Sequence, residues 1–321
     1  MKIGIIGAGV IGAGWTARFV LNGHDAVVFE PSDATWANLD AIVERAAGSY
    51  ADLGIGAPKR GSVTRVMSIA EAVASADHIQ ESVPEVLDFK RGILAQIDAA
   101  ARPDATIGSS TSGLLPTQLQ EGLSHPERML VGHPFNPVYL LPLVEIVGGK
   151  QTSEEAIAKA TAMYSSIGMK PLRVRKEIDA FIADRLLESV WREALWLVHD
   201  GVATTEEIDD AIKYGFGLRW AQMGLFETYR IAGGPAGMRH FMNQFGPALA
   251  WPWSKLTDVP PFNDELVDLI ASQSDAQSGH QSIAEMEADR DANLVAILRA
   301  LGSRNWGAGR VVMGGDARSN G

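Results

Sequence analysis

The first residues of the chain hold the pattern that most constrains its fold. The run "KIGIIG" is β-like and ends at Gly7, and Gly9 and Gly12 follow at the opening of a helix. In this context Gly7 permits a tight turn, Gly9 lets the backbone approach a diphosphate, and Gly12 lets the helix pack on the strand. The pattern predicts a dinucleotide site at a helix N-terminus, formed by the turn residues Gly7, Gly9, Val10, Ile11 and Gly12.

Strand-like and helix-like segments then alternate as far as about Gly149. The β-like runs are "KIGIIG", "AVVFE", "VTRVMS", "HIQES", "ATIGSS" and "RMLVGH", and a further helix leads into "MKPLRVRK". Such alternation is typical of a parallel sheet that helices cover on both faces. We therefore predict an α/β domain over residues 1–177, with the doubly wound, mostly parallel sheet of the Rossmann type.

The pattern changes after Ile178, where no convincing strand follows. The run "IDAFIADRLLESVWREALWLVHDG" repeats apolar residues at helical spacing and predicts a helix with a broad buried stripe. Thr204 and Glu207 have the spacing of a capping box and predict the start of another helix. We expect a smaller all-helical domain over residues 178–303 and a loosely ordered, glycine-rich tail over 304–321.

Composition excludes several classes of function. The formal net charge of −11 argues against nucleic acid or an anionic membrane as partner. The chain has no cysteine, so it has no disulfide, thiolate metal site or cysteine nucleophile, and we predict no metal site. It begins without the zones of a signal peptide, and no apolar run reaches the roughly 18 residues that span a bilayer. We expect a cytoplasmic protein.

Glu30 ends the second predicted strand. A carboxylate there can accept hydrogen bonds from the ribose hydroxyls of NAD, and it repels the 2′-phosphate of NADP. The residues that follow, "PSDAT", contain no arginine to bind that phosphate. NAD is therefore the predicted cofactor, and the alternative is a solvated glutamate at a strand end.

The stretch "GHPFNPVYLLPLVEIVGG" contains the predicted catalytic pair. His133 ends a predicted parallel strand, at the sheet edge where ligands of open α/β folds bind. Glu145 is a lone carboxylate in an apolar run, and an unpaired buried charge is costly, so it needs a partner. A neutral His133 can take a proton from a substrate hydroxyl, and Glu145 can balance the resulting cation. The alternatives are a core histidine and a charge at the edge of a strand.

The run "GSSTSGL" ends another predicted strand and offers three hydroxyl groups, those of Ser110, Thr111 and Ser112. A hydroxyl at this edge can hydrogen-bond a substrate oxygen. The alternative is that the run caps the helix that follows, as serine and threonine often do.

Six motifs together carry a resemblance to a known family. The order "GAGVIG", "ESVPE", "SSTSGL", "HPFNP", "PLVE" and "FIADRLL" resembles the 3-hydroxyacyl-CoA dehydrogenase superfamily over essentially the whole chain. The resemblance implies a Rossmann domain followed by a helical domain that forms a homodimer. It also implies roles for matched residues: a base and its partner, His133 and Glu145; substrate or histidine contacts, Ser112 and Asn136; and neighbours of the nicotinamide, Glu85 and Lys90.

Two features depart from the acyl-CoA members of that family. The family usually has asparagine where this chain has Asp184, so an anion replaces an amide and the substrate geometry cannot be carried over; the alternative is an exposed helix charge. Those members also offer CoA a lysine-rich helical insertion. Here residues 34–70 are nearly balanced, with Arg45, Lys59, Arg60 and Arg65 against Asp40, Glu44 and Asp52. A small hydroxy acid is the favoured substrate.

Two small-substrate branches of the family compete. They are the carnitine 3-dehydrogenases and the group of gulonate dehydrogenase and lambda-crystallin, and "HPFNPVYLLPLVEIVGG" with "FIADRLLE" looks closer to the first. The helical region is rich in aromatic residues, and aromatic rings bind quaternary ammonium groups with about 0.5 to 2 kcal/mol per contact. Our candidates for such contacts are the rings of Trp191, Phe216 and Trp220, helped by a nearby carboxylate such as Asp184, Glu188 or Glu227.

We therefore hypothesise NAD-dependent oxidation of the 3-hydroxyl of L-carnitine, a small molecule with a quaternary ammonium group. L-gulonate and 3-hydroxybutyryl-CoA are the alternative substrates. A third alternative is a crystallin-like protein that binds NAD without catalysis. The sequence does not determine which aromatic residues contact the substrate.

Overall fold

The chain divides into two compact units in the computed structural model. The first contains Met1–Ile182 and the segment from Asp291 onward, and the second is Ala183–Arg290. The sequence analysis placed the boundary at 177 and assigned residues up to 303 to the helical domain, so the structure differs at both points. The structure describes residues 1–221, 224–232, 240–241, 243–244, 254, 263–266, 268–269, 280 and 283–313.

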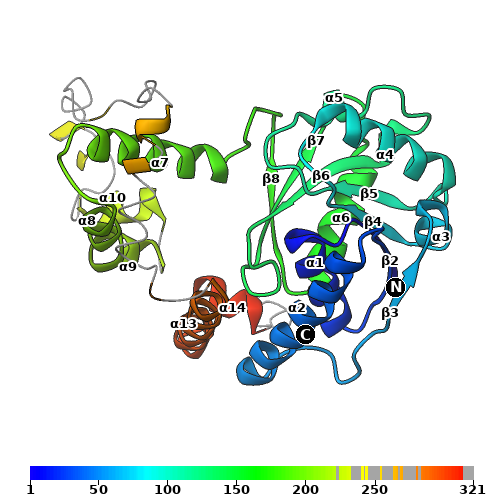
Figure 1. The fold of residues 1–321 in the computed structure, drawn as a ribbon, viewed down its shortest axis with the longest axis horizontal. Helices are drawn as coiled ribbons and strands as arrows, with labels where there is room; N and C mark the ends of the chain where they lie inside the picture. The colour runs from blue at the N-terminus through cyan, green and yellow to red at the C-terminus, as the bar shows by residue number, and fades with distance from the viewer. Residues whose placement is uncertain are drawn as a thin grey trace. The chain divides into compact units, whose positions relative to one another are not determined.

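An eight-stranded sheet forms the centre of the first unit (Figure 1). Its order is β3-β2-β1-β4-β5-β6-β7-β8, and all neighbours are parallel except β6 and β7, which are antiparallel. The predicted mostly parallel, doubly wound sheet is therefore confirmed. The strands are β1 (Lys2–Ile6), β2 (Asp25–Phe29), β3 (Val63–Val66), β4 (His78–Glu81), β5 (Thr106–Ser109), β6 (Met129–Pro134), β7 (Leu143–Gly148) and β8 (Lys170–Val174).

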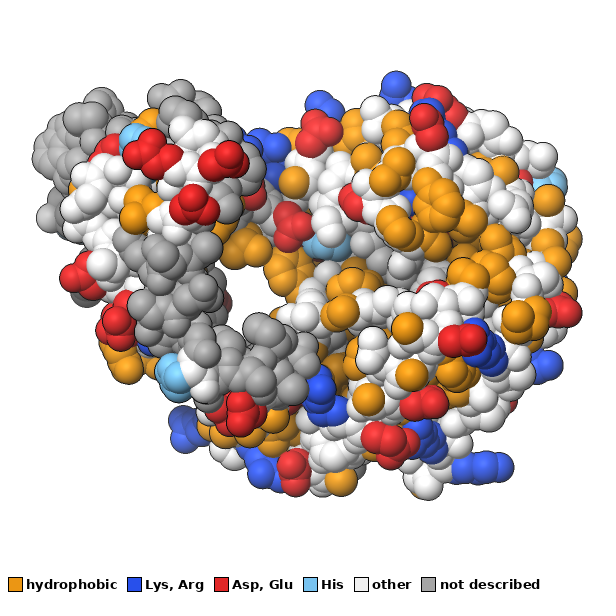
Figure 2. All heavy atoms as spheres, in the orientation of Figure 1, with side chains coloured by type: hydrophobic (Ala, Val, Ile, Leu, Met, Phe, Trp, Pro, Cys, Tyr) orange, Lys and Arg blue, Asp and Glu red, His pale blue; other side chains and the backbone are white. Residues whose placement is uncertain are grey.

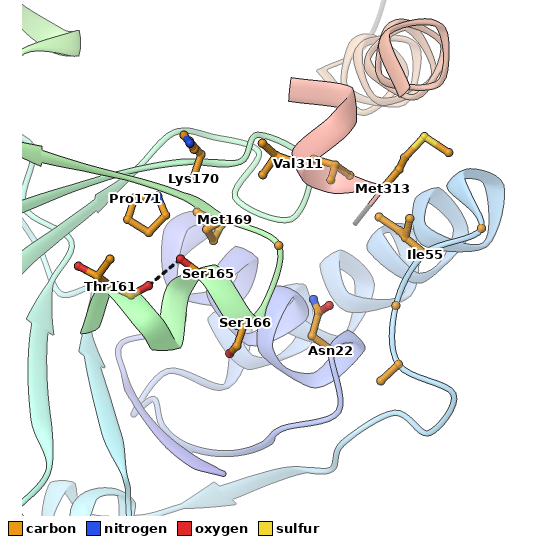
Figure 3. A pocket seen from close by; sticks show the side chains of 15 residues that line it. Asn22, Ile55, Thr161, Ser165, Ser166, Met169, Lys170, Pro171, Val311 and Met313 are labelled. Carbon is orange, nitrogen blue, oxygen red and sulfur yellow. Dashed lines mark hydrogen bonds between the residues drawn. The ribbon is translucent and has the colours of Figure 1, made fainter. Parts of the chain in front are cut away.

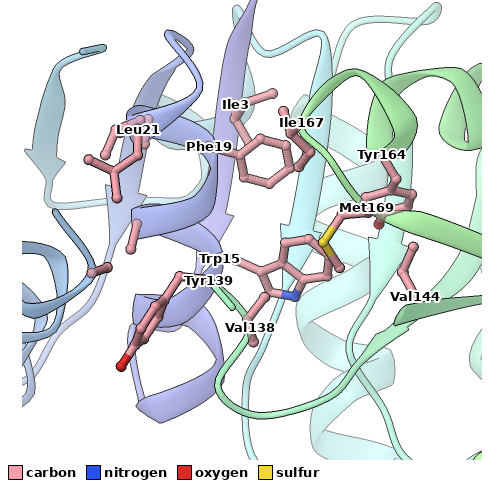
Figure 4. Close-up of a cluster of buried hydrophobic side chains, with 14 of the residues drawn as sticks. Ile3, Trp15, Phe19, Leu21, Val138, Tyr139, Val144, Tyr164, Ile167 and Met169 are labelled. Carbon is pink, nitrogen blue, oxygen red and sulfur yellow. The ribbon is translucent and has the colours of Figure 1, made fainter. Parts of the chain in front are cut away.

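Two hydrophobic clusters cover the sheet, because successive side chains of a strand point to opposite faces. Ile5 of β1 belongs to one cluster and Ile6 to the other. The cluster around Ile5 includes the stacked rings of Trp15 and Phe19, whose centroids lie 5.6 Å apart (Figure 4). The helices are α1 (Val10–Leu21), α2 (Asp33–Leu53) and α6 (Glu154–Ser166) in the cluster with Ile5, and α3 (Ile69–Val73), α4 (Leu87–Ala100) and α5 (Pro116–Leu119) in the cluster with Ile6.

Two C-terminal helices, α13 (Ile283–Ser303) and α14 (Gly307–Val312), reach the cluster that contains Ile5. Residues 304–313 were expected to be loosely ordered, but α14 is helical and Val312 is buried. A Cβ atom on Gly309 would lie 2.3 Å from the backbone nitrogen of Gly302. The glycines that made this region resemble a flexible tail instead let the two helices pack backbone to backbone.

The second unit is helical in its described residues, as predicted. Thr204 caps α8 in a capping box with Glu207, which confirms that feature of the sequence analysis. The helices are α7 (Ala183–His199), α8 (Thr205–Ala211), a π-helical turn (Ile212–Phe216), α9 (Gly217–Trp220) and α10 (Leu225–Ala232).

Helix α7 differs from its prediction in two ways. It begins at Ala183 rather than near Ile178, because the backbone at Ala180 and Phe181 has φ values of 58° and 50°, which place it in the left-handed region. The expected buried stripe is also exposed, with Leu187 59% and Trp191 52% accessible in this single chain.

Charged side chains of both signs are scattered over the visible face of the first unit (Figure 2). In the part of the chain that the structure describes, no helix is long and apolar enough to cross a membrane.

Candidate active site

The turn between β1 and α1 has the geometry of a diphosphate cradle. Gly7 has a φ of +88°, which favours glycine, and a Cβ atom on Gly12 would lie 1.9 Å from the carbonyl oxygen of Gly7. A Cβ atom on Gly9 would meet nothing within 4 Å, so this position faces open space at the N-terminus of α1. The turn therefore fits the dinucleotide that the glycine pattern predicts.

Glu30 lies beside this turn at the end of β2. It is 8% exposed, and its carboxylate accepts hydrogen bonds from the backbone N–H groups of Ala8 and Ser32, both at 2.9 Å. These bonds connect the acidic residue to the glycine turn, and the carboxylate keeps further lone pairs for a ribose hydroxyl.

Sequence reasoning counted Arg65 among the cations of residues 34–70 but did not place it next to Glu30, where β3 brings it. One guanidinium nitrogen donates to the backbone oxygen of Glu30 at 3.2 Å and lies 2.7 Å from a carboxylate oxygen of Asp33. The sequence analysis considered only the residues that directly follow Glu30, whereas Arg65 arrives through the pairing of Phe29 with Val66. Asp33 offsets the charge of Arg65, which is consistent with an NAD site.

His133 and Glu145 are brought together by the antiparallel pairing of β6 and β7, in which they are opposite residues. His133 Nδ1 and Glu145 Oε2 lie 2.9 Å apart, and both side chains are buried. The other carboxylate oxygen accepts the N–H of Ile182 at 2.9 Å. Because a carboxylate can only accept, Nδ1 carries the proton and Nε2 is the basic nitrogen of the neutral ring.

Two phenylalanine rings hold the imidazole in place. The ring centroids of Phe135 and Phe181 lie 5.4 and 5.6 Å from that of His133. Phe181 belongs to the left-handed turn before α7, which explains why the helix begins later than the apolar spacing predicts. This turn places both the Phe181 ring and the N–H of Ile182 at the His133–Glu145 pair.

Glu85 organises the loop after β5. Its Oε1 accepts from the Thr111 hydroxyl and from the N–H groups of Ser112, at 3.0 Å, and Gly113, at 3.3 Å. Thr111 therefore has a structural role in this loop, while Ser112 is exposed. Asn136 is also exposed, directly before a cis peptide bond to Pro137.

Lys90 is buried among partners within the protein, and its predicted place beside the nicotinamide stays a prediction. Its side chain is 1% exposed, and its ammonium group lies 2.8 Å from a carboxylate oxygen of Glu81 and 3.4 Å from one of Glu85. It also donates to the backbone oxygen of Val83 at 2.9 Å. Lys90 therefore holds the loop after β4, because the buried Glu81 needs a counter-charge. Sequence reasoning missed Glu81, although its place at a strand end in "HIQES" was a signal.

The candidate substrate residues of the second unit are separated along its helices. Phe216 and Trp220 form an edge-to-face pair with centroids 4.5 Å apart. Trp191 lines an apolar cavity of about 210 Å³ between α7 and α8, and Asp184 lies in the first turn of α7. The structure therefore brings together one pair of the four predicted residues.

Family models match both parts of the chain. Residues 2–178 match the NAD binding domain of 3-hydroxyacyl-CoA dehydrogenase, and residues 181–259 match its C-terminal domain. The chain belongs to the 3-hydroxyacyl-CoA dehydrogenase family. NAD is its cofactor, as the glycine turn and Glu30 predict.

Among curated members of the family, two relatives illustrate the similarity. L-carnitine dehydrogenase of Mesorhizobium japonicum is 60% identical over 96% of this chain and 86% of the relative. L-carnitine dehydrogenase/betainyl-CoA thioesterase of Agrobacterium fabrum is 61% identical over 97% of this chain. The chain spans 64% of the length of that second relative, so it corresponds to part of a longer protein there.

Solved structures of other dehydrogenases have a similar fold. A 5-formyl-3-hydroxy-2-methylpyridine 4-carboxylic acid 5-dehydrogenase, described as an NAD⁺-dependent dismutase, is 30% identical with a TM-score of 0.83, covering 93% of this chain and 97% of the other. The 3-hydroxybutyryl-CoA dehydrogenase of Escherichia coli K12 is 26% identical with a TM-score of 0.60, covering 77% and 53%.

A large cavity of the first unit is separate from the predicted site. Its volume is about 740 Å³, and side chains from α6 and α14 face it, including Ser165 and Val311 (Figure 3). None of the predicted site residues lines it. The Ser165 hydroxyl donates to the backbone oxygen of Thr161 at 2.8 Å, so this polar group is satisfied within α6.

Proposed function

We propose that this chain oxidises the 3-hydroxyl group of L-carnitine to the ketone of 3-dehydrocarnitine, with NAD as the acceptor. The observation that carries the chemistry is the buried hydrogen bond of 2.9 Å between His133 and Glu145. The substrate follows from relatives named L-carnitine dehydrogenase that are 60% and 54% identical over 96% and 93% of this chain.

The pair is suited to removing a proton from an alcohol. His133 Nε2 accepts the hydroxyl proton as the O–H bond breaks, and the imidazole becomes a cation. Glu145 balances this cation across the Nδ1–H bond and keeps the ring in one tautomer, while the N–H of Ile182 holds the carboxylate. Bound NAD supplies the hydride acceptor for the carbon that is oxidised. Ser112 and Asn136 are the proposed contacts to the substrate oxygen.

The charges of residues 34–70 support a small substrate over a CoA ester. Arg60 lies 2.9 Å from a carboxylate oxygen of Glu44, and Arg65 lies 2.7 Å from one of Asp33. Two of the four cations counted in this segment are therefore already paired with acids. A polyanionic CoA would need these cations unpaired.

The quaternary ammonium group of carnitine is the proposed specificity element. Trp191, Phe216 and Trp220 are the proposed aromatic contacts, with Asp184 as a counter-charge. A homodimer and a cytoplasmic location stay predictions.

The experiment is NADH production by the purified protein with NAD at alkaline pH, where release of a proton favours oxidation. L-carnitine, L-gulonate, 3-hydroxybutyrate and 3-hydroxybutyryl-CoA are tested separately. We expect turnover of L-carnitine, and a loss of most of kcat/KM for 3-hydroxybutyrate, which lacks the ammonium group. Equal turnover of 3-hydroxybutyrate contradicts recognition of that group, and turnover of the CoA ester alone contradicts the proposed substrate.

A further inference from the structure

A buried hydrogen-bonded network runs through the first unit toward the cofactor site. The Tyr164 hydroxyl donates to Gln80 Oε1 at 2.5 Å, and His78 Nε2 lies 3.2 Å from the same oxygen. Gln80 Nε2 donates to Ser110 Oγ at 2.7 Å, and the Trp15 indole N–H donates to that oxygen at 3.1 Å. Figure 4 shows Trp15 and Tyr164 in one cluster, with ring centroids 5.2 Å apart.

The chemistry of the partners fixes the direction of these bonds. Gln80 Nε2 also lies 3.3 Å from the backbone oxygen of Gly132, which can only accept, so the amide NH₂ faces Gly132 and Ser110. Ser110 Oγ thus accepts from two groups that can only donate, the amide of Gln80 and the indole of Trp15. Both of its lone pairs are occupied, so its own hydrogen must be donated.

Ser82 receives that hydrogen. Its Oγ lies 2.8 Å from Ser110 Oγ, and Ser82 therefore acts as the acceptor in this pair. In the described part of the chain, Ser82 Oγ makes no other hydrogen bond. Within the described residues, the network thus leaves the hydroxyl hydrogen of Ser82 available for donation to a further group.

The position of Ser82 identifies this group. Ser82 follows β4 directly, its N–H donates to the backbone oxygen of Ile6 at 2.8 Å, and a Cβ atom on Gly12 would lie 3.3 Å from its Cβ. It therefore borders the diphosphate cradle. Because β4 lies between β1 and β5, Ser82 is on the side of the cradle toward His133, where the nicotinamide half of the cofactor belongs.

We propose that Ser82 is a cofactor-binding residue whose hydroxyl donates a hydrogen bond to a phosphate or ribose oxygen in the nicotinamide half of the dinucleotide. Gln80 is the positioning residue that sets the direction of this bond through Ser110. The proposal rests on NAD binding and is independent of which alcohol the protein oxidises.

The first test compares ligand affinities of the Ser82→Ala variant with those of the wild type. We expect the Kd of NADH, measured by fluorescence titration, to rise about fivefold, the effect of losing one hydrogen bond of about 1 kcal/mol. ADP-ribose should lose affinity to the same degree, because it retains the diphosphate and both riboses. AMP should bind as before, since it lacks the nicotinamide half. Unchanged NADH affinity, or an equal loss for AMP, overturns the proposal.

The second test examines the direction of the hydrogen bond between Ser110 and Ser82. In Ser110→Ala, Ser82 keeps its own hydrogen, so the Kd of NADH should stay within about twofold of the wild type, although the protein loses stability. In Gln80→Glu, the carboxylate accepts the Ser110 hydrogen, Ser82 then donates to Ser110, and NADH affinity should fall as in Ser82→Ala. A Ser110→Ala variant that binds NADH as weakly as Ser82→Ala contradicts the direction, and this variant decides the point if Gln80→Glu does not fold.

Discussion

At the scale of single residues, the His133–Glu145 pair provides the sharpest prediction for catalysis. His133→Ala removes the proposed base and should lower kcat by about 10²–10⁴-fold, while the Kd of NADH stays within about twofold. Glu145→Gln should also lower kcat by at least about 100-fold, because the amide no longer balances the imidazolium. Steady-state rates with L-carnitine and NADH titration measure both effects.

A matched control for these variants is His125→Ala. The His125 side chain is 59% exposed and lies 3.6 Å from the Glu127 carboxylate at the surface, so its loss should leave both kcat and NADH affinity unchanged. If His133→Ala also loses NADH binding, the role of His133 is structural, and the proposed mechanism is wrong.

The residues that sequence reasoning located are those whose position is set by their own strand. His133 and Glu30 lie at or next to a strand end, and Glu145 lies within β7. A lone buried carboxylate needs a partner, so the proximity of His133 and Glu145 was predictable. Arg65 beside Glu30 was not, because it depends on which strand joins the edge of the sheet. Ser82 was not either, because its role depends on bonds that involve residues from α1, β4 and the loop after β5.

At the scale of elements, α6 packs closely on the sheet because two glycines of the sheet leave room for the Tyr164 side chain of α6. A Cβ atom on Gly108 of β5 would lie 2.6 Å from the Tyr164 hydroxyl, and one on Gly132 of β6 would lie 2.1 Å from it. Gly108→Ala should therefore lower the free energy of unfolding by about 2 kcal/mol, the cost of overpacking. Urea denaturation measures this loss.

The double variant distinguishes a specific clash from a general effect of alanine in β5. Tyr164→Phe removes the hydroxyl that the new methyl group meets, so Gly108→Ala with Tyr164→Phe should cost less than the sum of the two single changes. Gly92→Ala in α4 is the control, because its Cβ would meet nothing within 4 Å and alanine favours a helix. Additive losses contradict the fit described here.

The alternation of strands and helices was predictable from the sequence because apolar residues repeat at a different spacing in each kind of element. The residue at which α7 starts was not predictable, and neither was the ordered, helical structure of the C-terminal segment. The left-handed turn at Ala180 and Phe181 is set by contacts with His133 and Glu145 rather than by local propensity. The packing of α14 depends on a glycine of α13. From local composition alone, glycines in this segment indicate flexibility.

At the scale of the whole molecule, the buried network makes stability depend on pH. Burial lowers the pKa of His78 from its ordinary value of 6.5 to about 4, and the ring lies between Thr106 and Gln80. Burial likewise raises the pKa of Tyr164, so that side chain stays neutral. The unfolded chain therefore binds more protons than the folded chain between pH 6.5 and 4.

This difference determines the sign of the last prediction. The contribution of His78 is fully present above pH 6.5 and is lost as the pH falls toward 4, with a loss of about 2 kcal/mol between pH 7 and 5. His78→Asn should be less stable than the wild type at pH 7 but should lose about 2 kcal/mol less over the same interval, because it has no group to protonate. Urea denaturation of both proteins at pH 7 and 5 measures the two slopes. Equal slopes mean that His78 takes up its proton in the folded protein as readily as in the unfolded chain, so the network does not hold the ring neutral.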